Sequence, residues 1–218
     1  YLIEGEVEHK DSWGGQAIIE SGDIQWMTTG SGLIHSELVT KKFKINGGIM
    51  QGLQIWVNLP AKDKNVKPWY QHIKKIDIPT INKEDGVIVK VLVGTVENVF
   101  SSIQTQSPVS IFDIQFSEPK QVTFDINRRQ IAMIYIIDGE LKFSEVNKIA
   151  KKGQMVFFDQ SSDEIQIISK SIRGSYLVLA GEPLNENVVR YGPFVTNTEH
   201  QMKQAIANFH NGEMGKLS

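Results

Sequence analysis

Cysteine is absent from this chain of 218 residues. Disulfide bridges, thiolate nucleophiles and cysteine-bound metal are therefore excluded, and any metal site must be built from nitrogen and oxygen ligands. A chain without cysteine fits a reducing compartment, and we expect a cytoplasmic location.

Long apolar runs and a strong net charge are also lacking. No apolar stretch approaches the ~20 residues of a membrane-spanning helix. The formal net charge is −2, with 40% hydrophobic and 22% charged residues, which is the balance of an ordinary soluble domain. A charge this small does not draw a protein to nucleic acid or to an anionic membrane surface. We therefore expect no direct nucleic-acid partner and no membrane partner.

Strand signals dominate what is present. Short β-branched or aromatic runs are bounded by Gly, Pro, Asn, Asp or Ser at close spacing, a pattern typical of an all-β sandwich or barrel. The clearest of these runs predict strands at 52–60, 86–94, 109–116, 131–137, 154–159, 164–169 and 174–181.

A single helix is predicted near the end of the chain. Apolar residues recur at i, i+3, i+4 and i+7 from Met202 to Phe209, which gives one apolar stripe. Asn197 or Thr198 can cap its start and Gly212 suits its end. The stripe indicates a helix packed on a β-barrel, with a membrane or partner-binding role as the alternative.

The chain contains an internal repeat. Residues 1–7, Tyr-Leu-Ile-Glu-Gly-Glu-Val, match residues 135–141, Tyr-Ile-Ile-Asp-Gly-Glu-Leu, and each copy has a further glycine downstream, Gly22 or Gly153. These glycines suit tight turns that need a positive φ angle. The repeat predicts two tandem β domains. The expected boundaries are 1–103 for the first domain, 104–196 for the second, and 197–218 for the helix and tail.

The two copies differ in what precedes them. The second copy has two strand-like runs upstream of Tyr135, beginning near Ser107, whereas nothing precedes Tyr1. We therefore expect the first domain to lack its opening strands, whose loss would leave unpaired sheet edges.

One pair of residues points to metal chemistry. His35 and Glu37 lie two apart on a predicted strand, so their side chains face the same way. An imidazole and a carboxylate together suit Fe, Mn, Ni or Zn, although a histidine hydrogen-bonded to a glutamate in a barrel mouth would give the same pattern. Counting 13 residues from Gly22 reaches His35, and the same count from Gly153 reaches Gln166, with Ile168 in the place of Glu37. Only the first domain would then hold metal.

Three long segments carry a family resemblance. "GDIQWMTTGSGLIHSE" (22–37) resembles the second metal motif of the pirins, members of the cupin superfamily, and 52–64 and 181–209 resemble other pirin segments. The resemblance implies a bicupin, two tandem antiparallel β-barrels with a C-terminal helix. It also implies one metal in the N-terminal barrel, held by three histidines and a glutamate, of which His35 and Glu37 are two.

The other two histidines of that motif belong to an upstream segment that this sequence does not contain. We expect the remaining histidines of the chain, His9, His72, His200 and His210, to be surface or packing residues. We also expect the 218-residue chain itself to bind metal weakly or not at all and to be inactive.

The resemblance implies quercetin (flavonol) 2,3-dioxygenase activity in the complete protein, which cleaves the flavonol with oxygen and releases carbon monoxide. Fe(II) is the expected metal, one per chain, and other divalent metals also suit the ligands. Glu37 would serve as both ligand and catalytic base. The residues expected to line the substrate pocket are Trp26, Met27, Gln54 and Trp56, with core packing as the alternative for the tryptophan and methionine.

A second function of a different class stays open. Eukaryotic pirins are described as nuclear co-regulators, so the resemblance also implies an iron-dependent binding protein acting on transcription factors or metabolic enzymes. Such a protein would be nuclear in a eukaryote. In either case we expect a monomer.

Overall fold

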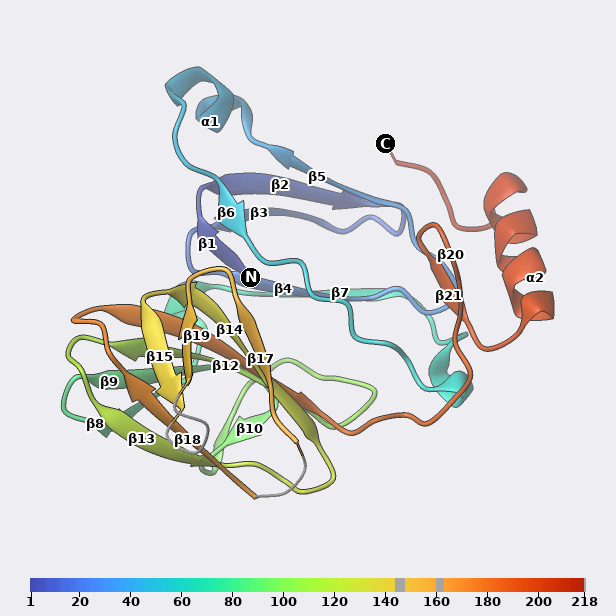
Figure 1. Ribbon diagram of the computed structural model, residues 1–218. Coiled ribbons are helices and arrows are strands. Elements are labelled where there is room, and N and C mark those ends of the chain that lie inside the picture. The colour runs from blue at the N-terminus through green and yellow to red at the C-terminus, as the bar shows by residue number, and fades with distance from the viewer. Residues whose placement is uncertain (144–147, 160–162, 218) are drawn as a thin grey trace. The chain divides into compact units, whose positions relative to one another are not determined.

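The chain divides into two units. The computed structural model describes residues 1–143, 148–159 and 163–217 (Figure 1). The first unit combines Tyr1–Asp77 with Leu184–Ser218, and the second is Ile78–Pro183. These units divide the chain at other places than the predicted domain boundaries, because residues 78–103 supply strands to the sheet of the second unit and the last part of the chain returns to the first.

The first unit is built from small antiparallel sheets. Its three-stranded sheet has the order β3-β2-β5, and β1, β4 and β20 each pair with one partner, respectively β6, β7 and β21. The strand bounds are β1 Leu2–Glu4, β2 Glu6–Asp11, β3 Gln16–Glu20, β4 Ile24–Thr28, β5 His35–Val39, β6 Gln51–Gly52, β7 Trp69–Ile73, β20 Val189–Tyr191 and β21 Phe194–Thr196. The helices are α1 Lys41–Asn46 and α2 Glu199–His210, with short 3-10 turns at Ala61–Asp63 and Lys75–Asp77.

The second unit has two larger sheets. A six-stranded sheet has the order β17-β14-β19-β12-β9-β8, a four-stranded sheet has the order β13-β18-β15-β16, and β10 pairs with β11. The bounds are β8 Thr80–Glu84, β9 Val87–Val93, β10 Thr95–Val96, β11 Val99–Phe100, β12 Val109–Phe116, β13 Gln121–Asp125, β14 Ile131–Asp138, β15 Glu140–Phe143, β16 Lys148–Lys151, β17 Met155–Phe157, β18 Glu164–Ser169 and β19 Gly174–Gly181.

Both sheets of the second unit contribute to one core. Alternate side chains along each strand point to the same side, and on the inner sides Val89, Ile114, Leu141 and Ile167 are fully buried in a shared cluster. The all-β class is confirmed, and the alternation in the sequence is its cause.

The repeated glycines occupy the backbone conformation that the repeat predicts. Gly5 and Gly139, which separate consecutive strands in the two copies, have φ angles of +106° and +86°. The φ angles of Gly22 and Gly153 are also positive, at +91° and +83°. Any residue with a Cβ atom would be strained in this region.

One predicted strand is not formed. β6 ends at Gly52, and residues 53–60 have no ladder partner among the residues that the structure describes. Only Leu53 continues the contact with the start of the chain, since its N–H donates to the Tyr1 carbonyl at 2.9 Å and its carbonyl accepts from the Tyr1 amino group at 3.0 Å. Alternating exposure still marks this segment, since Gln54 and Trp56 are exposed and Leu53 and Ile55 are half-buried. The prediction of a strand over 52–60 was wrong because alternation identifies a half-buried extended segment, whereas a strand also needs a neighbour.

The predicted terminal helix is confirmed as α2. The Thr198 side chain caps it by accepting from the Gln201 N–H at 3.2 Å, and Met202 is its buried anchor. In the part of the chain that the structure describes, no helix is long and apolar enough to cross a membrane.

Candidate metal centre

Strand pairing brings a second histidine to the predicted pair. β2 and β5 are adjacent and antiparallel, with His9 opposite Glu37 and Asp11 opposite His35. Residues directly opposite each other, and those two apart on one strand, share a face of the sheet. The four side chains of these two pairs therefore face the same side.

Three of these side chains converge on one point. His9, His35 and Glu37 each offer one ligand atom, and these atoms all lie within 4.8 Å of one another. The Glu37 Oε1 atom lies 3.7 Å from the His35 Nδ1 atom and 4.0 Å from the His9 Nδ1 atom. Both Nδ1 atoms are buried and find no hydrogen-bond partner among the described residues.

The two unpartnered nitrogens fit a metal ion. Leaving a buried polar atom unsatisfied costs about 1–3 kcal/mol, and here two such atoms face one carboxylate oxygen. Two imidazole nitrogens and a carboxylate are a donor set suited to divalent transition metals, including non-haem Fe(II). The residues present therefore fit the metal that their chemistry implies.

A second carboxylate orients His9. The His9 Nε2 atom lies 3.2 Å from Asp11 Oδ2, and Asp11 Oδ1 accepts from the backbone N–H groups of Trp13 at 2.8 Å and Gly15 at 2.9 Å. Burial raises the pKa of Asp11, but these donors and the His9 ring more than offset it and hold the pKa below its usual value. An ionised carboxylate only accepts hydrogen bonds. We therefore assign the ring proton to Nε2, which leaves the Nδ1 lone pair turned toward Glu37.

Glu37 is oriented by two residues of the neighbouring β4-β7 ladder. The Gln25 amide nitrogen donates to Glu37 Oε1, and the Tyr70 hydroxyl donates to the Gln25 amide oxygen at 2.9 Å. The Tyr70 ring also stacks on His9, with centroids 4.2 Å apart and planes within 8°. Burial, and then the negative charge of Glu37 and other nearby carboxylates, raises the pKa of Tyr70. The phenol therefore keeps its proton at neutral pH and fixes which end of the Gln25 amide faces Glu37.

His9 was expected to be a surface or packing residue. It is 0% exposed, as a packing residue would be, and its Nδ1 atom lies in the cluster with His35 and Glu37 that could hold a metal ion, a placement that the sequence analysis did not foresee. The available signal was the alternation in Glu-His-Lys-Asp, which puts His9 and Asp11 on one face of a strand. His72 instead bonds to Asp23 at 2.9 Å, and His200 and His210 lie in α2.

The predicted substrate-lining residues fall in different surroundings. Met27 shares a face of β4 with Gln25 and so lies on the side of the metal centre, whereas Trp26 faces the other way. Gln54 lies on the segment that follows β6, as does Trp56, which is 57% exposed and has the Arg190 guanidinium 5.3 Å from its ring. A substrate role for these residues stays a prediction.

Comparison with known proteins gives the family. A family model described as "Pirin" matches residues 1–57, and one described as "Pirin C-terminal cupin domain" matches residues 111–215. Human Pirin is 34% identical over 220 residues, which are 99% of this chain and 73% of that protein. The chain belongs to the pirin family. Pirin-1 of Arabidopsis thaliana is likewise 34% identical, over 99% of this chain and 74% of its own length.

A solved structure confirms the cupin fold of this pirin. Quercetin 2,3-dioxygenase from Acinetobacter baumannii superimposes with a TM-score of 0.93 at 31% identity, covering 99% of this chain and 74% of that one. The predicted bicupin architecture with a C-terminal helix is therefore confirmed.

Proposed function

We propose that this pirin binds one divalent metal at His35 and Glu37, with His9 as the third donor, and that the metal centre cleaves flavonols with molecular oxygen. The observation that carries the metal proposal is the pair of buried, unpartnered Nδ1 atoms facing one carboxylate oxygen. The likeness to a quercetin 2,3-dioxygenase supports the reaction.

Fe(II) is the metal that we propose, because two imidazoles and one carboxylate leave coordination positions open for substrate and oxygen. A bound divalent metal would hold the flavonol 3-hydroxyl and lower its pKa. Glu37 would accept the proton that this hydroxyl releases. Gln25 and Tyr70 hold Glu37 in place during that transfer, and Met27 offers apolar surface for the flat ring on the same side of β4.

Two ligand sets can be told apart by experiment. The family resemblance adds two histidines upstream of Tyr1, whereas the structure puts His9 beside His35 and Glu37. Metal content should be measured by mass spectrometry on the 218-residue chain and on a chain extended upstream by those histidines. If the ligands are His9, His35 and Glu37, then His9→Ala and His35→Ala should each abolish metal binding by the shorter chain.

The control for these variants is His210→Ala, the same change at an exposed position of α2. It should leave the metal content unchanged. Glu37→Ala should be milder, since water can replace a carboxylate ligand. If, in the extended chain, His9→Ala keeps its metal while His35→Ala loses it, His9 is a packing residue and the upstream histidines complete the site.

Oxygen uptake with quercetin tests the reaction on metal-loaded protein. The dioxygenase proposal expects uptake that is lost in His35→Ala. A loaded protein that consumes no oxygen with several flavonols would refute the enzyme proposal and leave the alternative, an iron-dependent binding protein acting on a transcription factor or metabolic enzyme.

A further inference from the structure

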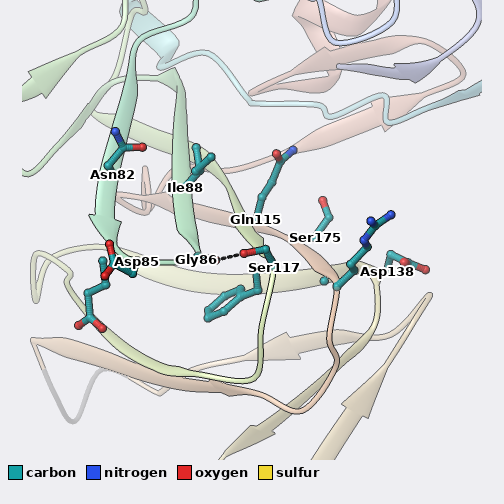
Figure 2. A pocket seen from close by; sticks show the side chains of 12 residues that line it. Asn82, Asp85, Gly86, Ile88, Gln115, Ser117, Asp138 and Ser175 are labelled. Carbon is teal, nitrogen blue, oxygen red and sulfur yellow. Dashed lines mark hydrogen bonds between the residues drawn. The ribbon is translucent and has the colours of Figure 1, made fainter.

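A cavity of about 710 Å³, lined by both polar and apolar side chains, lies in the second unit at one end of its six-stranded sheet. Its volume falls within the roughly 300–1,000 Å³ of pockets that accept small molecules. Side chains in direct register across five strands form its floor, in the order Asn82, Ile88, Gln115, Ser175 and Asp138. Figure 2 shows Ile88, Gln115 and Ser175 rising from the same face of the sheet.

A buried carboxylate on the same face of β12 as Gln115 orients two of these side chains. Asp113 is 1% exposed and accepts from the Ser175 hydroxyl at 2.8 Å and from the Gln115 amide nitrogen at 2.8 Å. The Ser175 hydroxyl proton is thereby committed, so toward the cavity its oxygen can only accept. The Gln115 amide is held in one orientation and keeps its carbonyl oxygen and one N–H for a ligand. The floor is therefore ordered before anything binds.

The charges that line the cavity are largely balanced. Glu84 lies 3.5 Å from the Lys120 ammonium, and Asp138 lies 3.1 Å from the Lys152 ammonium. Asp85 and Arg173 also line the cavity, are exposed and take part in none of the ion pairs found among the described residues, so one carboxylate and one guanidinium are left to offset each other. Paired carboxylates do not select for a cation, and one exposed carboxylate together with one exposed guanidinium selects for neither sign of charge. The cavity thus favours a neutral ligand, to which Arg173 can donate.

The floor of the cavity also contains one exposed apolar side chain. Ile88 is 43% exposed and stands in the floor between the carboxamides of Asn82 and Gln115. Sugars and polyols combine C–H surfaces, which pack on aliphatic side chains, with neighbouring hydroxyls, which each donate and accept. We propose that this cavity binds a neutral, hydroxyl-rich small molecule of the sugar or polyol class, with its C–H face on Ile88 and its hydroxyls on Gln115, Ser175 and Arg173.

This inference does not depend on the metal centre, so its test needs no metal. Saturation-transfer NMR should be recorded on the 218-residue chain with methyl glycosides of glucose, galactose and mannose and with myo-inositol. At least one of these probes should bind, with a Kd on the order of millimolar. Gln115→Leu and Arg173→Ala should each weaken that binding by about tenfold, the effect of losing one good hydrogen bond.

Gln121→Leu is the matched control, because Gln121 is an exposed residue of β13 outside the cavity and its loss should not change binding. Gln115→Leu could disturb the fold, because Gln115 bonds to the buried Asp113. Arg173→Ala then tests ligand binding by itself, since Arg173 is exposed and its loss should leave the fold intact. Absence of saturation transfer from every probe would overturn the proposal. Binding that survives Arg173→Ala unchanged, or a site that takes spermidine or citrate in preference to the sugars, would overturn it as well.

Discussion

Replacing Asp23 with alanine should destabilise the first unit by about 3–5 kcal/mol. Asp23 is 3% exposed and accepts three hydrogen bonds, from the backbone N–H groups of Glu20 at 3.0 Å and Lys75 at 2.8 Å and from the His72 ring at 2.9 Å. Each bond to an ionised acceptor contributes roughly 1.5–3 kcal/mol. The total falls short of a simple sum because water can enter the space that alanine leaves.

The more conservative change, Asp23→Asn, should cost about 1–3 kcal/mol. Asparagine keeps one acceptor oxygen but turns an NH₂ group toward a donor. Asp77→Asn is the control, because Asp77 is exposed near the same turn. It should change the free energy of unfolding by less than about 0.5 kcal/mol.

The stability of the protein in acid should also depend on the Asp23 carboxylate. Burial raises the pKa of Asp23, but the N–H groups of Glu20 and Lys75, and then His72, more than offset burial and hold the pKa below its usual value. A carboxyl whose pKa is lowered by folding stabilises the fold above its unfolded pKa of about 3.9, and this contribution is lost as the pH falls through the folded value. Asp23→Asn should therefore lose less stability than the wild type between neutral pH and that range.

Tryptophan fluorescence during urea denaturation is the assay. All tryptophans of the chain lie in the first unit, at positions 13, 26, 56 and 69, so the signal reports the unit that contains Asp23. A loss below about 1 kcal/mol in Asp23→Ala, or identical acid sensitivity in Asp23→Asn and wild type, would refute the reasoning.

Three further changes test other parts of the molecule. Tyr70→Phe removes the donor that fixes Gln25 and should weaken metal binding by about tenfold, as outer-shell changes do, measured by competition with a chelator; unchanged affinity would contradict the orienting role. Thr198→Ala removes the cap of α2 and should cost about 1 kcal/mol in urea denaturation, whereas an unchanged midpoint would show that the cap is dispensable. Ile134→Ala opens a cavity in the core of the second unit and should cost about 2–5 kcal/mol when followed by far-UV circular dichroism; a cost under about 1 kcal/mol would mean that the core collapses around the cavity.

Local periodicity determined much of this protein from the sequence alone. Alternation predicted most of the strands, and a 3.6-residue period with a threonine at its start predicted α2. The positive φ angles at Gly5 and Gly139 could be predicted because glycine is the residue that readily adopts such angles. His35 and Glu37 share a face because the side-chain period of a strand is two. Each of these features depends on neighbours in the sequence, so it could be inferred without coordinates.

The tertiary structure decided what depends on pairing between distant segments. His9 joins His35 only because β2 pairs with β5 in one particular register, and Tyr70 reaches Gln25 only because β7 pairs with β4. The segment 53–60 carries a strand pattern yet forms no strand, because no described segment pairs with it. Strand pairing is set by which surfaces bury together across the whole chain, and a local pattern does not contain that information.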